Sequence, residues 1–195
     1  MQLASFLEES PLTWPVANEV CIELGAGTGL AGIIAAQCLA KKVVITDYPA
    51  PEILANLRTN VSTNIRGKAE VEVKGHEWGV LDGAFERENE GRFSRVLVAD
   101  CLWMPHQHGN LLRSIRWFLA AGGRAWVIAG FHTGREKMRG FYGKDALEMA
   151  GLEVERIWER NADGGEREWV EDRGREDVTE RKRWLVVGIL KRVGD

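Results

Sequence analysis

A glycine-rich loop lies between an apolar strand and an apolar helix near the start of the chain. Residues 20–24 read Val-Cys-Ile-Glu-Leu, which is typical of a short buried strand, and residues 30–39 carry apolar side chains at helical spacing. Gly25, Gly27 and Gly29 fall between them. Glycines let a ligand approach the backbone closely, and the N-terminus of the following helix offers free N–H groups. The loop therefore predicts a site for a nucleotide-like ligand.

The details of this loop separate two kinds of nucleotide cofactor. A dinucleotide-binding loop needs glycine at positions 25, 27 and 30, and residue 30 is leucine. Glu23, two residues before the first glycine, would repel a pyrophosphate but suits a cofactor that carries an ammonium and a sulfonium group. S-adenosylmethionine is such a cofactor. A nicotinamide-dinucleotide reductase is the less favoured alternative.

Apolar runs alternate with amphipathic stretches along the 195 residues, which is typical of one domain with a parallel sheet built from βαβ units. We predict an α/β, doubly wound, Rossmann-like sheet of seven strands, whose last two strands are antiparallel because no helical pattern separates them. The predicted strands are 20–24, 42–46, 68–74, 95–99, 125–129, 152–158 and 184–190. The predicted helices are 30–39, one that starts near Pro51, one over 111–119 that Gly122 and Gly123 end, and 136–150, with a polar loop at 83–91.

Charge and hydropathy exclude several classes of partner. The net charge is -3, so the chain has no overall basic field that would hold a nucleic acid without sequence preference. The longest apolar run, residues 30–40, is much shorter than the roughly 20 residues of a membrane span. The first residues lack the basic start of a signal peptide. We therefore expect a soluble, cytoplasmic protein that binds neither nucleic acid nor membrane.

The cysteines and histidines do not form a recognisable metal site. Cys21, Cys38 and Cys101 are odd in number, widely spaced and set among apolar residues, so they are expected to be small buried side chains. His106 and His108 have no carboxylate or third ligand at a suitable spacing. No metal is expected.

Four motifs in order resemble the seven-β-strand, S-adenosylmethionine-dependent methyltransferases. These motifs are residues 23–29, 46–49, 76–79 and 99–103. Within that superfamily the chain resembles the nicotinamide N-methyltransferase-like protein methyltransferases, in particular the fungal branch that methylates translation elongation factor 1-alpha at its N-terminus and a nearby lysine. The choice of branch depends on Asp47-Tyr48-Pro49 and on residues 171–174.

The resemblance implies a set of cofactor-binding residues. The set is Glu23, Gly25, Ala26, Gly27, Asp47, Tyr48, Trp78 and Ala99. The glycine loop would line the methionine portion, and Ala99 would contact the cofactor through its backbone. Asp47 would hold the ribose, a role that also fits its place at the end of a strand about 20 residues beyond the loop; capping of the next helix is the alternative. Trp78 would stack on the adenine, and the alternative is a tryptophan of the core.

Asp100 and Trp103 correspond to an acid-x-x-aromatic element that faces the methyl acceptor in this family. The family usually has tyrosine or phenylalanine where this chain has Trp103. Asp100 would attract an ammonium group and accept its proton directly or through water, and Trp103 would offer the cation an aromatic face. No Asn-Pro-Pro-Tyr element follows residue 98, so a protein amine or a small amine is expected rather than a nucleobase.

Two segments outside these motifs carry further predictions. Residues 159–183 contain 16 charged residues of both signs, which predicts a solvated loop, with docking of a protein substrate as the alternative. Family members have a tryptophan-bearing segment that helps to close the cofactor site, and only 19 residues precede Val20, so residues 1–195 are expected to be one methyltransferase domain that is short at its N-terminus.

These predictions favour S-adenosylmethionine-dependent N-methylation of a protein amine, a lysine or an N-terminus, with S-adenosylhomocysteine as the product and elongation factor 1-alpha as the candidate partner. One alternative is a small-molecule, nicotinamide-like N-methyltransferase. The other is a non-catalytic module that binds the cofactor but lacks a lid.

Overall fold

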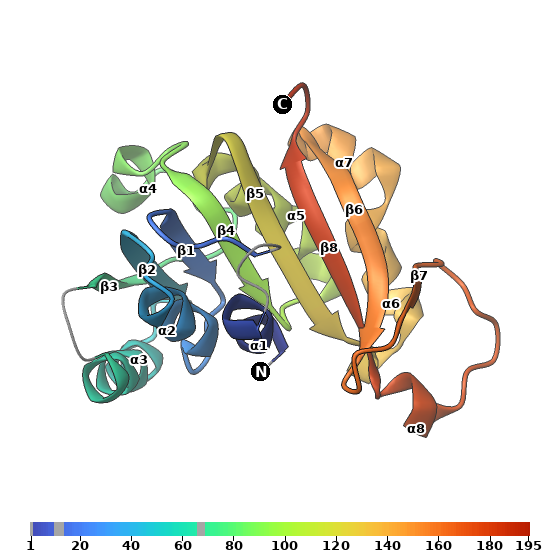
Figure 1. The fold of residues 1–195 in the computed structure, drawn as a ribbon. Coiled ribbons are helices and arrows are strands. Elements are labelled where there is room, and N and C mark those ends of the chain that lie inside the picture. The colour runs from blue at the N-terminus through green and yellow to red at the C-terminus, as the bar shows by residue number, and fades with distance from the viewer. Residues whose placement is uncertain (1, 10–13, 66–68) are drawn as a thin grey trace.

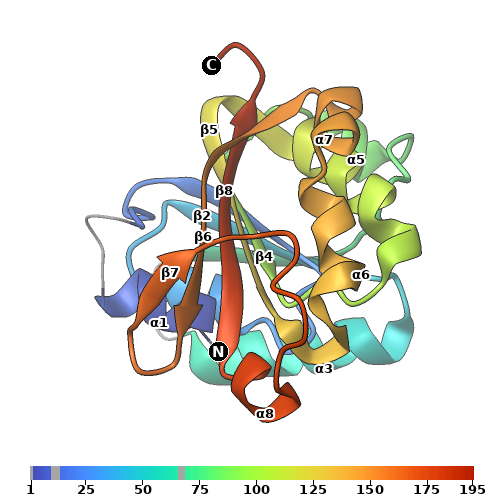
Figure 2. The ribbon, with the colours of Figure 1, turned by 90° about the vertical axis from the view of Figure 1, so that its right-hand side faces the viewer.

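One mixed sheet with helices on both faces forms the centre of the molecule (Figures 1 and 2). The computed structural model describes residues 2–9, 14–65 and 69–195. The strands are β1 (Val20–Leu24), β2 (Lys42–Asp47), β3 (Glu70–Gly75), β4 (Phe93–Ala99), β5 (Leu119–Gly130), β6 (Leu152–Asn161), β7 (Glu166–Glu168) and β8 (Trp184–Arg192). The α-helices are α1 (Gln2–Glu9), α2 (Leu30–Gln37), α3 (Pro51–Asn64), α4 (Ala84–Glu88), α5 (His108–Phe118), α6 (Arg135–Arg139), α7 (Lys144–Ala150) and α8 (Val178–Arg181). The 3-10 turns are η1 (Pro105–Gln107), η2 (Phe131–Thr133) and η3 (Gly140–Tyr142).

The strand order is β3-β2-β1-β4-β5-β8-β6-β7. Strands β1 to β5 pair in parallel, whereas β8 runs antiparallel to both β5 and β6. This arrangement confirms the predicted doubly wound, Rossmann-like class and the antiparallel last pair. It adds an eighth strand, β7, which pairs with β6 over only three residues. Since β4 lies beside β1, the carboxyl ends of these two strands meet at one place, where ligands bind in open α/β sheets.

The sheet separates two apolar cores. On one face, α5 buries side chains spaced three and four residues apart, among them Leu111, Ile115 and Phe118. On the other face, α1, α2 and α3 bury their apolar sides. Trp14 belongs to this second core, where its ring stacks on Phe6 at 5.3 Å between centroids and meets Trp126 edge-on at 4.9 Å.

Four local predictions were wrong for physical reasons. The helix predicted over 111–119 ends at Phe118 rather than at Gly122 and Gly123, because buried Leu119 is already extended and pairs with Phe93 of β4. The helix predicted over 136–150 is broken into α6, η3 and α7 at Gly140 and Gly143. A glycine in the interior of a helix destabilises the helix by about 1 kcal/mol relative to alanine.

The other two errors concern segments that were predicted to be loops. The polar loop at 83–91 contains α4, and residues 159–183 contain β7 and α8. The start of the third predicted strand at Lys68 lies outside the described residues.

The cysteines behave largely as the sequence indicates. Cys21 and Cys101 are buried, Cys38 is partly buried, and all three are free thiols. Burial raises the pKa of the Cys21 thiol to about 12. In the part of the chain that the structure describes, no helix is both long enough and apolar enough to cross a bilayer.

Candidate active site

A cavity of about 790 Å³ opens at the carboxyl ends of β1, β2 and β4. This volume is within the range of roughly 300–1,000 Å³ that is typical of small-molecule sites. All ten residues predicted for the cofactor and acceptor sites line it: Glu23, Gly25, Ala26, Gly27, Asp47, Tyr48, Trp78, Ala99, Asp100 and Trp103. The fold therefore brings together residues that are up to 80 positions apart in the sequence.

Glycine is required in the loop after β1 by backbone conformation and by space. Gly25 and Gly27 have φ angles of 65° and 57°, which residues other than glycine rarely adopt. A Cβ atom on Gly25 would lie 2.5 Å from Cζ2 of Trp78 and 2.8 Å from Sγ of Cys101. A Cβ atom on Gly27 would have no described atom within 4 Å. The loop thus packs against Trp78 at one glycine and leaves free space at the next.

Asp47 lies at the end of β2 and holds the glycine loop. Its Oδ2 accepts a hydrogen bond from the Gly27 amide at 2.6 Å, and its Oδ1 accepts one from the Tyr48 amide at 2.6 Å. In the described structure α3 begins after Ala50 without a side-chain cap, so the alternative role of Asp47 as a helix cap is not what is observed. Each carboxylate oxygen has more than one acceptor position, which leaves Asp47 able to bind hydroxyl groups as well.

Glu23 is buried beneath the loop. Its Oε2 accepts a hydrogen bond from the Gly32 amide in the first turn of α2 at 2.8 Å. Burial raises the pKa of Glu23 to about 8, although the Gly32 amide acts in the opposite direction. The carboxyl group lines the cavity and also fixes the start of α2.

The loop that carries Trp78 is held by a buried polar group that the sequence did not suggest. His76 donates or accepts through both ring nitrogens, with Nδ1 2.8 Å from Glu86 Oε1 and Nε2 2.9 Å from Ser114 Oγ. The Ser114 hydroxyl also accepts from the Gly79 amide at 2.9 Å. Burial lowers the pKa of His76, against the effect of Glu86. Trp78 is partly buried, and it both packs against the core and lines the cavity.

Asp100 and Trp103, the residues predicted to face the methyl acceptor, follow the end of β4 and line the cavity. Asp100 has a φ of 57°, a conformation that non-glycine residues adopt at a cost, and such positions cluster at functional sites. Its Oδ1 accepts a hydrogen bond from the Gly130 amide at 3.1 Å, and its Oδ2 is 3.7 Å from Nε2 of His132. Trp103 is mostly exposed beside it.

Other residues of the cavity were missed by sequence reasoning. The first helix contributes Leu3 and Ala4, and the remaining ones are Thr28, Leu30, Ala31, Ile53, His76, Glu77, Cys101, Met104 and Gln107. The spacing of Leu3, Phe6 and Leu7 is that of a helix with one apolar face and could have predicted α1.

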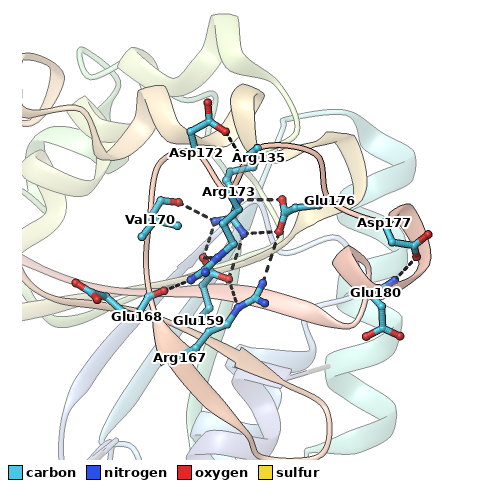
Figure 3. Close-up of polar contacts among 11 residues, drawn as sticks. Arg135, Glu159, Arg167, Glu168, Val170, Asp172, Arg173, Glu176, Asp177 and Glu180 are labelled. Carbon is cyan, nitrogen blue, oxygen red and sulfur yellow. Dashed lines mark hydrogen bonds and ion pairs between the residues drawn. The ribbon is translucent and has the colours of Figure 1, made fainter.

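The charged segment near the C-terminus is not simply a solvated loop. Glu159, at 0% exposed, binds three guanidinium groups that converge on it in Figure 3: Arg135 at 2.5 Å, Arg167 at 2.7 Å and Arg173 at 3.3 Å. Arg135 also binds Glu176 at 3.0 Å. Burial disfavours the charge of Arg135, but its hydrogen bonds to Glu176 and Glu159 outweigh this and keep its pKa above the ordinary value.

This ion network contacts the turn after β5, which also carries His132, the histidine near Asp100. Arg135 follows His132 by three residues, and its guanidinium lies over the ring of Phe131 at 4.3 Å and that of Trp169 at 5.2 Å. The turn after β5 therefore connects Asp100 to the charged segment.

The lysine methyltransferase family matches residues 6–144, which are more than two thirds of the chain. The chain belongs to this family. Among its relatives are fungal proteins named protein N-terminal and lysine N-methyltransferase EFM7. That of Candida glabrata is 33% identical over 60% of this chain and 47% of its own length. Those of Schizosaccharomyces pombe and Gibberella zeae are 30% and 32% identical over 82% and 83% of this chain. The chain spans 64% and 66% of their lengths, so it matches between about half and two thirds of these relatives.

Solved structures have the same fold as this chain at low sequence identity. A TehB-like SAM-dependent methyltransferase from Corynebacterium glutamicum has a TM-score of 0.65 at 17% identity, covering 97% of this chain and 86% of its own. Magnesium protoporphyrin IX methyltransferase from Synechocystis, solved with bound SAH, has a TM-score of 0.63 at 12% identity, covering 98% and 81%. The predicted family and the predicted class I methyltransferase fold are confirmed, and S-adenosylmethionine is the cofactor of that class.

Proposed function

We propose that this chain is an S-adenosylmethionine-dependent N-methyltransferase that acts on a protein amine, a lysine side chain or an N-terminus. The observation that carries the proposal is the cavity itself, whose lining brings the glycine loop, Asp47 and Trp78 together with Asp100 and Trp103. Family membership and the names of the fungal relatives support the same reaction.

The residues of the cavity fit the cofactor. The free space at Gly27 leaves room for a ligand against the backbone, the carboxylate of Asp47 can accept hydrogen bonds from ribose hydroxyls, and the ring of Trp78 offers adenine an apolar face. The proposed cofactor site also includes Ala26, Tyr48 and Ala99, which line the same cavity. When bound, the cofactor supplies an electrophilic methyl group on a positively charged sulfur.

Asp100 and Trp103 of the cavity lining fit an amine. An amine attacks only when it is unprotonated, and the carboxylate of Asp100 attracts the ammonium form from solution. The exposed ring of Trp103 adds a cation–π contact with the same group. Leu3 and Ala4 of α1 add apolar side chains to the lining of the cavity, which helps to exclude water. These residues contribute alignment and electrostatics rather than covalent chemistry.

Elongation factor 1-alpha is the acceptor that we propose to test first, in keeping with the resemblance to the fungal branch and with a cytoplasmic location. A mixed-charge segment beside the acceptor site suits a protein surface better than a small neutral ring.

The deciding experiment incubates the chain with isotope-labelled S-adenosylmethionine and, in parallel, purified elongation factor 1-alpha, a peptide of its N-terminus and free nicotinamide. Mass spectrometry then locates the label. Label on a lysine or the N-terminus of the protein supports the proposal. Label on nicotinamide alone indicates the small-molecule alternative, and S-adenosylhomocysteine binding with no turnover on any amine indicates the binding module.

Replacing Asp47 by alanine is expected to weaken S-adenosylhomocysteine binding at least about tenfold. A charge-assisted hydrogen bond contributes roughly 1.5–3 kcal/mol, and the variant also loses the bond to the Gly27 amide. Calorimetry of the wild type, Asp47→Ala and Asp82→Ala measures this, because Asp82 is an exposed acid outside the cavity lining. Equal affinity in all three proteins would show that Asp47 does not hold the ribose.

Replacing Trp78 by alanine is expected to weaken S-adenosylhomocysteine binding about two- to tenfold, since stacking contributes roughly 0.5–1.5 kcal/mol beyond the buried area. Because Trp78 also packs against the core, the melting temperature of ligand-free Trp78→Ala should fall as well, whereas Trp78→Phe should keep most of the stability and most of the affinity. Unchanged affinity in Trp78→Ala would instead indicate a core tryptophan that does not touch the adenine.

A further inference from the structure

A second proton-carrying side chain lies beside Asp100, which is one of the residues that line the cavity. His132 belongs to η2, the turn after β5, and its Nε2 is 3.7 Å from Oδ2 of Asp100. The ring lies across Gly130, because a Cβ atom there would be 2.5 Å from the same nitrogen. The Gly130 amide in turn donates to Oδ1 of Asp100. The end of β5 thus positions the carboxylate and the imidazole together.

The pair is open to solvent, and its separation allows one amine to contact both groups. The side chains of Asp100 and His132 are 59% and 58% exposed. At 3.7 Å the carboxylate and the imidazole make no direct hydrogen bond with each other. A nitrogen at an ordinary hydrogen-bond distance of about 2.9 Å from both atoms fits this separation. One amine can therefore contact both acceptors at once.

We propose that His132 takes the proton of the incoming ammonium while Asp100 binds its charge, an inference that rests on the proposed N-methyltransferase function. In model peptides imidazole is a stronger base than a carboxylate, and histidine is the side chain that exchanges protons most readily near neutral pH. When the ring carries its proton on Nδ1, Nε2 is an acceptor.

The proton transfer balances without a co-reactant. One N–H bond of the ammonium breaks, and its electron pair stays on the nitrogen as the nucleophilic lone pair. The proton bonds to Nε2 of His132, and the resulting imidazolium is stabilised by the Asp100 carboxylate 3.7 Å away. Because the ring is exposed, the imidazolium then releases the proton to water, which restores the neutral ring for the next turnover.

The test compares His132→Ala with His106→Ala, its matched control. His106 is an exposed histidine of η1, and among the described residues it forms no ion pair with Asp100, unlike His132. We expect kcat on an amine-bearing peptide to fall about 10²-fold or more in His132→Ala and to stay unchanged in His106→Ala. Added imidazole should restore the rate of His132→Ala by at least about tenfold, since it replaces the missing base.

A binding measurement separates the two roles without turnover. In the presence of S-adenosylhomocysteine, fluorescence anisotropy should show that Asp100→Asn weakens binding of the peptide more than His132→Ala does, because only Asp100→Asn removes the negative charge that attracts the ammonium. A wild-type rate in His132→Ala overturns the inference, and so does a slow variant that imidazole fails to rescue. If the wild type itself methylates no amine, the proposed function fails and the role of His132 fails with it, whereas an active wild type with an equally active His132→Ala contradicts His132 alone.

Discussion

Asp100→Asn is expected to slow methyl transfer to a protein amine by about 10²–10⁴-fold, the range for loss of a general base or of a comparable electrostatic partner. Asparagine keeps the shape of the side chain and can still accept from the Gly130 amide, so the left-handed backbone at residue 100 is retained. The variant loses only the negative charge that attracts the ammonium and stabilises a protonated His132.

The measurement is kcat on the acceptor protein together with calorimetry of S-adenosylhomocysteine, whose affinity should stay within about twofold. Asp145→Asn, at an exposed acid in α7 outside the cavity lining, should behave as the wild type in both assays. Full activity in Asp100→Asn would remove Asp100 from the reaction. Robust methylation of free nicotinamide, with none of any protein, would instead replace the protein acceptor by a small molecule.

The parts of the fold that follow from local burial could be predicted from the sequence. The central residues of β1, β2 and β4 are apolar and buried on both faces of the sheet. Such short, nearly continuous apolar runs are typical of strands in a parallel sheet. The glycine loop predicted the turn after β1, and the place of Asp47 at the end of β2 followed from the apolar run before it. These elements depend on residues close by in the sequence, which explains why their predicted places agree with the structure.

Features that depend on distant contacts could not be predicted in this way. The end of α5 at Phe118 depends on the pairing of Leu119 with Phe93, 26 positions earlier. The approach of His132 to Asp100 depends on the adjacency of β4 and β5. A single histidine in a turn carries no sequence signal for such a contact, so the sequence could not place His132 beside Asp100.

The charged segment shows the same limit at a larger scale. In the sequence its mixed charges indicate solvation, because charged residues are seldom fully buried unless they are paired. In the structure the partner of Glu159 on the α6 side is Arg135, 24 positions away, and the two are almost completely enclosed. Because three guanidinium groups pair with the Glu159 carboxylate, this charged residue is buried rather than solvated. The pairing is a tertiary contact and cannot be seen in the sequence.

Glu159→Gln is accordingly expected to destabilise the fold by about 3–5 kcal/mol, the usual cost of removing one partner from a buried ion pair. For a chain of this size the loss corresponds to a fall in melting temperature of roughly 6–20 °C. Glu153→Gln is the matched control on the same strand, since Glu153 pairs with Lys191 at 3.0 Å at the surface, where an ion pair contributes at most about 1 kcal/mol. Calorimetric melting of both variants measures the difference, and equal melting temperatures would contradict a stabilising role for the network.

The same variant tests whether the charged segment docks the protein acceptor. The network fixes residues 166–176 against the turn that carries His132, so loosening it should raise the KM for the whole acceptor protein. The KM for a short peptide that reaches only the cavity should change little, as should the affinity for S-adenosylhomocysteine, because none of the ion-network residues lines the cavity. A parallel rise of KM for protein and peptide would place the effect in the cavity and leave the segment with a purely structural role.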